Sequence, residues 1–388
     1  MSIIQSHLDN DLYKFTMANA VFSKFPNYSV EYRFDCRNEA NWDKDQHDIL
    51  LEEIDSYCKI RFQEDELDYL YSLNLFSSEF IQYLRGWQPN SKNILTVLSA
   101  GKLKLILING TWLDQILLEV PLLAMINEVW FSGLNWNWKN NEKNGYKKLD
   151  QKLSLVKNDP NFKFADFGTR RRFSFPWQGQ VIEKLKDCTG FVGTSNVFYA
   201  RKYNLTPIGT MAHEWIMGGA GRPDTSFLNS QKAQLQTWSD VYRGNLGIAL
   251  TDTYGMKKFL KDFDLYFAKL YDGLRHDSGD PFEWGDMAIE HYKKLGIDPT
   301  TKTLVFSDGL TIEKAIEINK YFEGRAKISF GIGTHLTNDF DYIEPLKIVI
   351  KMTRCNEHPT IKISDEPAKT MCMDEKFKEY ALDIMQVY

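Results

Sequence analysis

The chain has few cysteines, no long uninterrupted apolar run and no excess of positive charge. Its 388 residues include five cysteines, which form no C-x-x-C pair, and 47 Lys+Arg stand against 52 Asp+Glu for a formal net charge of −5. This balance excludes a broadly basic surface of the kind that binds nucleic acid or anionic lipid. Scattered cysteines in odd number indicate reduced, buried thiols and a cytosolic protein.

The most apolar long stretch, residues 113–131, is interrupted by Asp114, Glu119, Pro121 and Glu128. These residues favour a buried helix with a kink near the proline over a membrane span. The first fifteen residues carry charges where a signal peptide needs an apolar core. We therefore expect a cytoplasmic protein that is neither exported nor inserted into a membrane.

Hydrophobic periodicity divides the chain into two parts. Helical patterns and alternating strands in the first third indicate an α+β lobe, with helices at 9–24, 45–59 and 65–74 and strands at 30–36, 93–99 and 103–109. From residue 162 short apolar runs alternate with helical patterns, the runs being 162–167, 190–193, 207–209, 248–250, 270–274, 303–306, 326–330 and 346–350. Such alternation indicates βαβ units and a parallel sheet.

The fold class predicted is α/β, an irregular (β/α) barrel with an attached α+β lobe. The predicted boundaries are 1–125 for the lobe, joined by 352–388, and 126–351 for the barrel. The polar, turn-rich residues 135–145 are expected to form a surface connection.

Polar clusters follow the predicted strands, where barrel enzymes place their chemistry. Arg170, Arg171 and Arg172 follow the strand that ends near Phe167. Guanidinium groups there suit phosphate or carboxylate, and the Phe167 ring suits stacking on a flat heteroaromatic substrate. For an Arg triplet alone, a solvated basic stretch is the ordinary alternative.

His213 stands at the head of a predicted helix, where an imidazole can act as a base or as a nucleophile toward phosphate. A lone histidine is more often a hydrogen-bonded structural residue. The string at 275–280 (RHDSGD) joins Arg275 and Asp277 in a pattern that suits a sugar phosphate with Mg²⁺, although it also reads in part as a helix-capping turn.

Two glycine-containing turns, at 307–309 and 331–334, allow the backbone to approach phosphate oxygens, and plain turns are the alternative. No G-x-x-x-x-G-K-[ST] string occurs, so a Walker A loop is excluded. The GxG at 331–333 lacks the third glycine of the dinucleotide fingerprint.

Taken in order, eight strings resemble the nicotinate phosphoribosyltransferase family of type II phosphoribosyltransferases. They are DLYKFTM at 11–17, EYRF at 31–34, FADFGTRRRF at 164–173, FVGTSN at 191–196, PIGTMAHE at 207–214, TDTYG at 251–255, RHDSGDP at 275–281 and FGIGT at 330–334. The resemblance implies an ATP-dependent ligase of NAD salvage. Such an enzyme joins nicotinate to 5-phosphoribosyl 1-diphosphate (PRPP), giving nicotinate mononucleotide and diphosphate.

The resemblance also implies roles for particular residues. His213 would be transiently phosphorylated by ATP, and the pyridine ring would lie against Tyr13 and Phe167. The nicotinate carboxylate would meet Thr210 and either Arg170 or Arg275. The residues expected to hold PRPP are Arg275, Asp277, Ser278, Asp308, Gly309, Gly331, Gly333 and Thr334, with Mg²⁺ accompanying PRPP and ATP.

Tyr13 is distant in sequence from the barrel, and the resemblance implies that it completes a pocket across the subunit boundary of a homodimer. Relatives that act on nicotinamide carry an Asp near the 193–194 turn, whereas this chain has Ser195 and Asn196, which favours the acid over the amide. The same fold acting on nicotinamide or quinolinate remains an alternative. A phosphosugar aldolase using Lys347 or Lys351, and a binding protein without activity, have less support.

Overall fold

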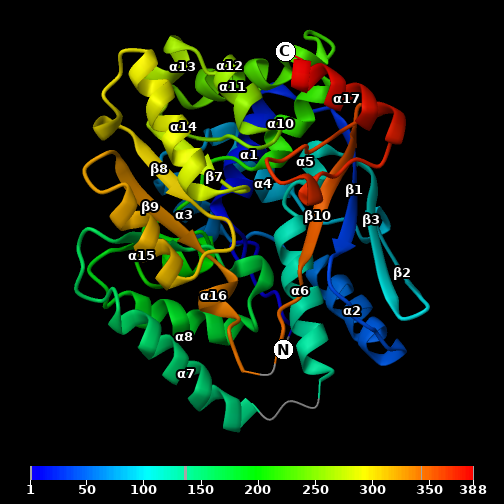
Figure 1. Ribbon diagram of the computed structural model, residues 1–388. Coiled ribbons are helices and arrows are strands. Elements are labelled where there is room, and N and C mark those ends of the chain that lie inside the picture. Colours follow the sequence, from blue (N-terminus) through cyan, green and yellow to red (C-terminus); the bar gives the residue numbers. More distant parts are fainter. Residues whose placement is uncertain (1, 135–137, 342, 388) are drawn as a thin grey trace.

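The computed structural model describes residues 2–134, 138–341 and 343–387. It contains two sheets, a five-stranded antiparallel sheet in the order β11-β10-β1-β3-β2 and a six-stranded parallel sheet in the order β5-β4-β9-β8-β7-β6. In Figure 1 the parallel sheet lies on the left and the antiparallel sheet on the right, with α6 between them. The α/β class predicted from the sequence is confirmed.

The antiparallel sheet gathers strands from both ends of the chain. Its members are β1 (Ser29–Cys36), β2 (Ile94–Ser99), β3 (Lys102–Thr111), β10 (Ile348–Cys355) and β11 (His358–Pro359). The N-terminal helices are α1 (Leu12–Lys24), α2 (Lys44–Tyr57), α3 (Glu64–Ser72), α4 (Ser78–Gly86), α5 (Trp112–Gln115) and α6 (Glu119–Ser132). The predicted helices and strands of the first third are confirmed to within a few residues.

One predicted strand belongs to the other sheet. Residues 346–350 were expected to close the series of parallel strands, but β10 pairs antiparallel with β1, with Ile350 opposite Phe34. Most of β10 is buried. A strand covered on both faces has the same continuous apolar run in either kind of sheet, so the sequence pattern does not distinguish them.

The apolar stretch at residues 112–132 lies in the core. By length and composition it resembles a membrane span, but 83% of its most apolar window is buried inside the protein. The stretch breaks at residues 116–118 between α5 and α6, just before Pro121. The prediction of a buried helix interrupted near the proline is confirmed.

Strands and helices alternate in the second part as predicted, except that residues 207–209 form no strand of the sheet and make only an isolated bridge between Pro207 and Thr194. The parallel strands are β4 (Lys163–Asp166), β5 (Phe191–Thr194), β6 (Ile248–Leu250), β7 (Gly273–His276), β8 (Thr303–Phe306) and β9 (Lys327–Ile332). The helices among them are α8 (Phe175–Leu185), α9 (Val197–Lys202), α10 (His213–Gly218), α11 (Ser230–Tyr242), α12 (Met256–Asp262), α13 (Leu265–Leu270), α14 (Pro281–Lys294), α15 (Ile312–Tyr321) and α16 (Thr334–Thr337).

Residues 207–210 connect the two edges of the parallel sheet. The Ile208 amide donates to the Thr194 carbonyl of β5 at 2.9 Å. The Thr210 hydroxyl donates to the Ile248 carbonyl of β6, also at 2.9 Å. A segment that contacts both edge strands curls the sheet round on itself, as in an irregular (β/α) barrel.

The predicted surface connection at 135–145 is wrong for its described part. Residues 138–145 begin α7 (Trp138–Ser154), while 135–137 lie outside the described residues. Leu149 and Leu153 are buried one helical turn apart, and Lys152 bonds Asp339 at 2.5 Å. These anchors fix the helix although its first turns are rich in Asn, Lys and Gly.

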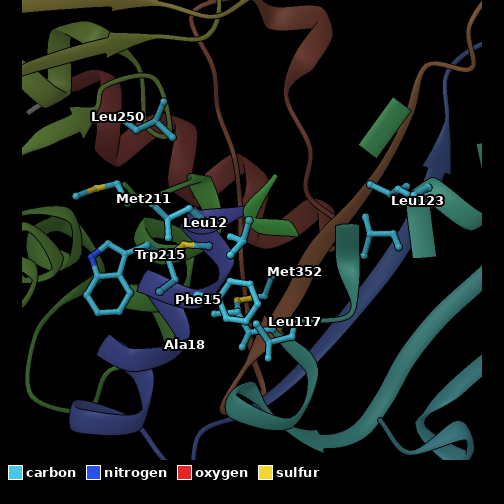
Figure 2. Close-up of a cluster of buried hydrophobic side chains, with 14 of the residues drawn as sticks. Leu12, Phe15, Ala18, Leu117, Leu123, Met211, Trp215, Leu250 and Met352 are labelled. Atoms are coloured by element: carbon cyan, nitrogen blue, oxygen red, sulfur yellow. The ribbon is translucent and has the colours of Figure 1, made fainter. Parts of the chain in front are cut away.

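The hydrophobic core is continuous between the two parts. Figure 2 shows Leu12 and Phe15 of α1 in one cluster with Trp215 of α10 and Met352 of β10. Leu117, between α5 and α6, belongs to the same cluster. All five side chains are at most 2% exposed. The packing of α1 and β10 against α10 places elements from both ends of the chain beside His213. The C-terminal helix α17 (Glu375–Val387) follows β11, and the proposed domain boundaries stay a prediction.

Candidate functional site

A cavity of about 400 Å³ lies at the carboxyl ends of the parallel strands. The turns after these strands form one wall, with Phe167 after β4, Asp277 after β7 and Gly333 after β9. The cavity is also lined by Tyr13 at the start of α1 and Lys351 of β10. Because parallel strands direct their carboxyl ends to one side, residues far apart in sequence meet there.

Most of the residues predicted for the site line this cavity. They are Tyr13, Phe167, Arg170, His213, Arg275, Asp277, Gly309, Gly331, Gly333 and Thr334. Three predicted residues have other positions in the described structure. The Thr210 hydroxyl donates to a β6 carbonyl, Ser278 donates to Asp252 at 2.6 Å, and Asp308 pairs with Lys369 at 2.7 Å.

Two aromatic residues of the cavity, Phe167 and Tyr13, lie close against glycines. The Phe167 ring covers Gly331 so closely that a Cβ at position 331 would lie 2.3 Å from the ring. Gly209 allows the same close approach on the other side, since a Cβ there would lie 2.9 Å from the Tyr13 amide nitrogen. Burial raises the pKa of Tyr13 well above its ordinary value, so its hydroxyl stays protonated.

Tyr13 therefore lines the same cavity as His213 of its own chain. The packing of α1 places it there: the Leu12 amide donates to the Ser195 carbonyl at 2.8 Å, which fixes the first turn of α1 at the end of β5. The expectation that Tyr13 completes a pocket across a subunit boundary stays a prediction.

The three consecutive arginines have different environments. Arg172 is fully buried, with ion pairs to Asp9 at 2.6 Å and Glu128 at 2.7 Å, so its role is structural. Arg171 lines the cavity but donates twice to the Ile348 carbonyl of β10. The expected cluster of three available cations is thus reduced to Arg170, with Arg171 held in part by β10.

Arg275 and Arg170 keep their donors available. The Arg275 Nε atom is buried and has no hydrogen-bond partner within the described part of the chain. A buried donor without a partner costs free energy, which a bound anion removes. Arg170 also lines the cavity, and nearby Tyr13, Glu119 and Asp277 raise its pKa against the effect of burial.

His213 is the first residue of α10 and is held by two carboxylates. Its Nε2 atom lies 2.8 Å from Oδ1 of Asp252 and 3.5 Å from Oδ2 of Asp277. Burial, with Lys362 as the next cause, lowers the pKa of His213 to about 4. The imidazole is then neutral at pH 7, with Nε2–H donating to Asp252 and the Nδ1 lone pair available to a ligand.

His213, Asp252 and Asp277 resemble a metal site by spacing alone, since their ligand atoms lie within 4.8 Å of one another. The contacts of Asp252 do not fit a cation. Its Oδ1 accepts from His213, and its Oδ2 accepts from Ser278 and lies 3.0 Å from the Lys362 ammonium. Mg²⁺ prefers several oxygen ligands and water rather than a site that already holds an ammonium group.

A buried ion network lies directly behind His213. The Glu214 carboxylate accepts from Lys14, from the Tyr32 hydroxyl and from the Trp112 indole at 2.7 Å. Lys14 is fully buried and also pairs with Glu119 at 2.5 Å. The network ties α10 to α1, β1 and α6. Glu214 is therefore not the residue that orients the His213 imidazole.

The turn after β5 carries no carboxylate of its own, but one reaches it from α1. The Ser195 hydroxyl donates to Oδ1 of Asp11 at 2.7 Å, and both residues line the cavity. Burial raises the pKa of Asp11, although Ser195, Thr169 and Arg170 act in the opposite direction. Asn196 is buried and caps α9 through the Tyr199 amide.

Sequence reasoning missed three residues of this region. Asp252 and Lys362 lie behind His213, and Lys351 is part of the cavity wall. Asp252 lies in the TDTYG string, which carried part of the family resemblance without a role for the aspartate. Lys362 is isolated in sequence, and no local pattern indicates it. Lys351 was considered only for a rival chemistry, because β10 was expected in the other sheet.

Comparisons with known proteins agree along the whole chain. Residues 162–387 match the model of the nicotinate phosphoribosyltransferase family, and residues 8–127 match its N-terminal domain. A nicotinate phosphoribosyltransferase from Xanthomonas campestris is 47% identical over 98% of this chain and 96% of its own. A crystal structure of such an enzyme from Vibrio cholerae superposes with a TM-score of 0.92 at 38% identity, covering 99% of this chain and 94% of its own. One from Porphyromonas gingivalis superposes with a TM-score of 0.91 at 35% identity, covering 99% of this chain and 100% of its own.

Proposed function

Because this chain belongs to the nicotinate phosphoribosyltransferase family, we propose that its cavity joins nicotinate to PRPP, with His213 coupling the reaction to ATP hydrolysis. The products are nicotinate mononucleotide and diphosphate, and the reaction supplies NAD synthesis from nicotinate. The observation that carries this proposal is that His213, held by Asp252, lines the same cavity as Phe167 and Arg275.

In the proposed ATP-dependent step, Nδ1 of His213 attacks the γ-phosphorus of ATP. The N–P bond forms as the bond to ADP breaks, and Asp252 keeps the proton on Nε2 throughout. Neutral imidazole is the nucleophilic form. The phosphorylated ring adds negative charge and acceptor oxygens to the cavity, and these form further contacts with the substrates. Water then hydrolyses the N–P bond.

In the transfer step the pyridine nitrogen attacks C1 of the ribose as diphosphate leaves. Negative charge develops on the diphosphate, and the Arg275 guanidinium is placed to stabilise it. The ribose gains positive charge, and the Asp277 carboxylate, held by the Ser307 hydroxyl at 3.0 Å, suits that end. Gly309 and Gly333 leave room for phosphate oxygens to approach the backbone.

We propose nicotinate rather than nicotinamide as the substrate, because of the charges around the place of its carboxylate. Arg170 supplies a cation, and the Ser195 hydroxyl replaces the carboxylate expected of amide-specific relatives. Asp11 lies beside Ser195, and the nearby Arg170 guanidinium, which acts to lower the pKa of Asp11 against the effect of burial, offsets its charge. Competition among nicotinate, nicotinamide and quinolinate in the same assay distinguishes the three substrates, and preference for the amide would contradict this assignment.

Mg²⁺ is proposed to accompany PRPP and ATP through their phosphate oxygens, which offer the oxygen ligands it prefers. The His213 cluster does not fit Mg²⁺, because Asp252 already holds the Lys362 ammonium group. A homodimer also stays a proposal. It has no support from Tyr13, which lies in the cavity of its own chain.

The phosphohistidine role is tested with His213→Ala. We expect the variant to keep slow, ATP-independent transfer while it loses nicotinate-stimulated ATP hydrolysis and the gain in PRPP affinity that ATP gives. Incubation with ATP labelled at the γ-phosphate should give acid-labile, base-stable label on the wild-type protein only. His335→Asn alters a second histidine of the cavity wall and should still be labelled. Stimulated ATP hydrolysis by His213→Ala would show that the phosphohistidine role is wrong.

A further inference from the structure

We propose that Lys362 is a positioning residue for His213: its ammonium group holds Asp252 toward the imidazole and supplies from within the protein the positive charge that this acidic cluster lacks. The inference rests on the proposed function, because it explains how His213 is prepared for phosphorylation. Lys362 comes from the C-terminal segment after β11, more than a hundred residues from either member of the pair it acts on.

The Asp252 carboxylate is held from both sides. Its Oδ1 accepts from Nε2 of His213 at 2.8 Å. Its Oδ2 accepts from the Ser278 hydroxyl at 2.6 Å and lies 3.0 Å from Nζ of Lys362. Asp252 is fully buried, so these contacts replace solvation by water. The orientation of the carboxylate therefore depends on Lys362 and Ser278 as much as on His213.

Lys362 is placed to act on Asp252 and not on substrate. Neither Lys362 nor Asp252 is among the described residues that line the cavity, and the Lys362 side chain is only 7% exposed. Its backbone is fixed on two sides. Lys362 and Met371 exchange backbone hydrogen bonds of 3.0 and 2.8 Å, and the Ile363 amide donates to the Thr253 carbonyl, next to Asp252, at 2.7 Å.

A second contact from the same segment reaches Asp252 through Ser278. The Ser364 hydroxyl donates to the Ser278 hydroxyl at 2.8 Å, and the Asp365 amide donates to the same oxygen at 3.1 Å. Ser364 has φ 68°, a left-handed conformation that is unusual for a residue with a side chain. Such strain persists where surrounding contacts hold it, and here the contact is the hydrogen bond to Ser278.

Four charged groups face His213, and all of them come from elements other than its own helix α10. They are Asp252 after β6, Asp277 after β7, Lys351 of β10 and Lys362 after β11. The Lys362 ammonium group, joined by that of Lys351 below about pH 7, thus opposes two carboxylates around the imidazole. Without Lys362 the carboxylates predominate and stabilise the imidazolium, which has no lone pair to attack phosphate. The lowered pKa of His213 agrees with this balance.

The test compares Lys362→Met with Lys362→Arg in the full-length protein. Nitrogen-15 NMR of labelled histidine reports the protonation of His213 without any need for turnover. We expect the pKa of His213 to rise by about 1–3 units in Lys362→Met, as for loss of a charge at this range, and to stay low in Lys362→Arg. The rate of ATP-dependent phosphorylation in Lys362→Met should then fall as pH decreases from about 7 toward 5, through the raised pKa, and match that of wild type at more alkaline pH.

Lys258→Met is the matched control. Lys258 forms an equally buried pair with Asp262 at 2.6 Å within α12, and it is not among the described residues of the cavity wall. Its loss tests whether removal of any buried lysine has the same effect. It should leave the pKa of His213 and the pH profile unchanged. If Lys362→Met fails to fold, Lys362→Gln removes the same charge with a polar side chain and is measured in its place.

An unchanged pKa of His213 in a folded, neutral variant at position 362 would overturn the proposal. So would an equal shift in Lys258→Met, because the effect would then be general destabilisation. If wild-type protein takes no label from ATP, the proposed phosphohistidine is wrong. A shifted His213 pKa in Lys362→Met supports the role of Lys362 even then, since NMR measures it independently of the reaction.

Discussion

At the scale of single residues, Lys351 is a second lysine whose charge depends on its surroundings. Its side chain lines the cavity, and the described residues give it no hydrogen bond or ion pair. Burial is the main cause that lowers its pKa to about 7, and Lys362 and Arg170 add to this effect against the attraction of Glu119. The protonated form attracts an anionic substrate, and this attraction is lost as pH rises through about 7.

We therefore expect the KM for PRPP to rise by up to about tenfold between pH 6.5 and 8.5, equivalent to one pKa unit of interaction. The measurement is initial rate against PRPP concentration at several pH values. Lys351→Gln serves as the control, because it shares every other titrating group, including those of PRPP. Its KM should be higher at pH 6.5 and nearly independent of pH. Parallel pH profiles for the two proteins would show that Lys351 is not the group responsible.

The residues that sequence reasoning identified are those whose chemistry is local. His213, Arg275 and Asp277 each stand in a short polar string that follows a strand, and the structure brings all three to the cavity. Arg172 stands in such a string too, yet it is buried against Asp9 and Glu128. Its partners come from distant parts of the chain, so the sequence alone does not separate it from Arg170.

At the scale of elements, α10 depends on a carboxylate adjacent to His213. Glu214 is 7% exposed and accepts from Lys14, Tyr32 and Trp112. Glu214→Ala leaves those three donors without this acceptor, and Lys14 keeps only Glu119. Loss of one partner from a buried ion pair typically costs about 3–5 kcal/mol. We expect a decrease of that size in the free energy of unfolding, measured with urea.

An exposed pair gives the control for this measurement. Lys59 and Asp55 are 73% and 61% exposed, so Asp55→Ala should leave the urea midpoint nearly unchanged. An equally small effect in Glu214→Ala would contradict the view that the buried network holds α10 in place.

The elements themselves were predicted well where periodicity has one interpretation. β1 covers Ser29–Cys36 where a strand was predicted at 30–36, and β6 covers Ile248–Leu250 as predicted. The sheet to which β10 belongs could not be predicted, because pairing with β1 is a long-range contact that leaves the apolar pattern unchanged. The position of β10 places Lys351 on the cavity wall, so this part of the site could not be predicted from the sequence either.

At the scale of the whole molecule, the net charge of −5 does not describe the cavity. Arg170, Arg275 and Lys351 lie on its wall together with Asp277 and Glu119. Both signs are present, and the carboxylates are held by specific donors such as Lys14 and Ser307. Selectivity for anionic substrates must therefore come from which cations lack a partner, and not from a general excess of positive charge.

The arrangement of the whole molecule also determines whether one chain alone makes a complete site. Tyr13 and His213 line one cavity of a single chain, so a lesion at either position damages the site of the chain that carries it. We expect Tyr13→Ala and His213→Ala, mixed and refolded together, to recover no ATP-dependent activity beyond the sum of the two variants. The measurement is activity after separation of mixed species by two affinity tags, with wild type mixed with His213→Ala as the positive control. Recovery of about half of wild-type activity, roughly what one restored site out of two gives in a purified shared-site heterodimer, would mean that Tyr13 acts across a subunit boundary after all.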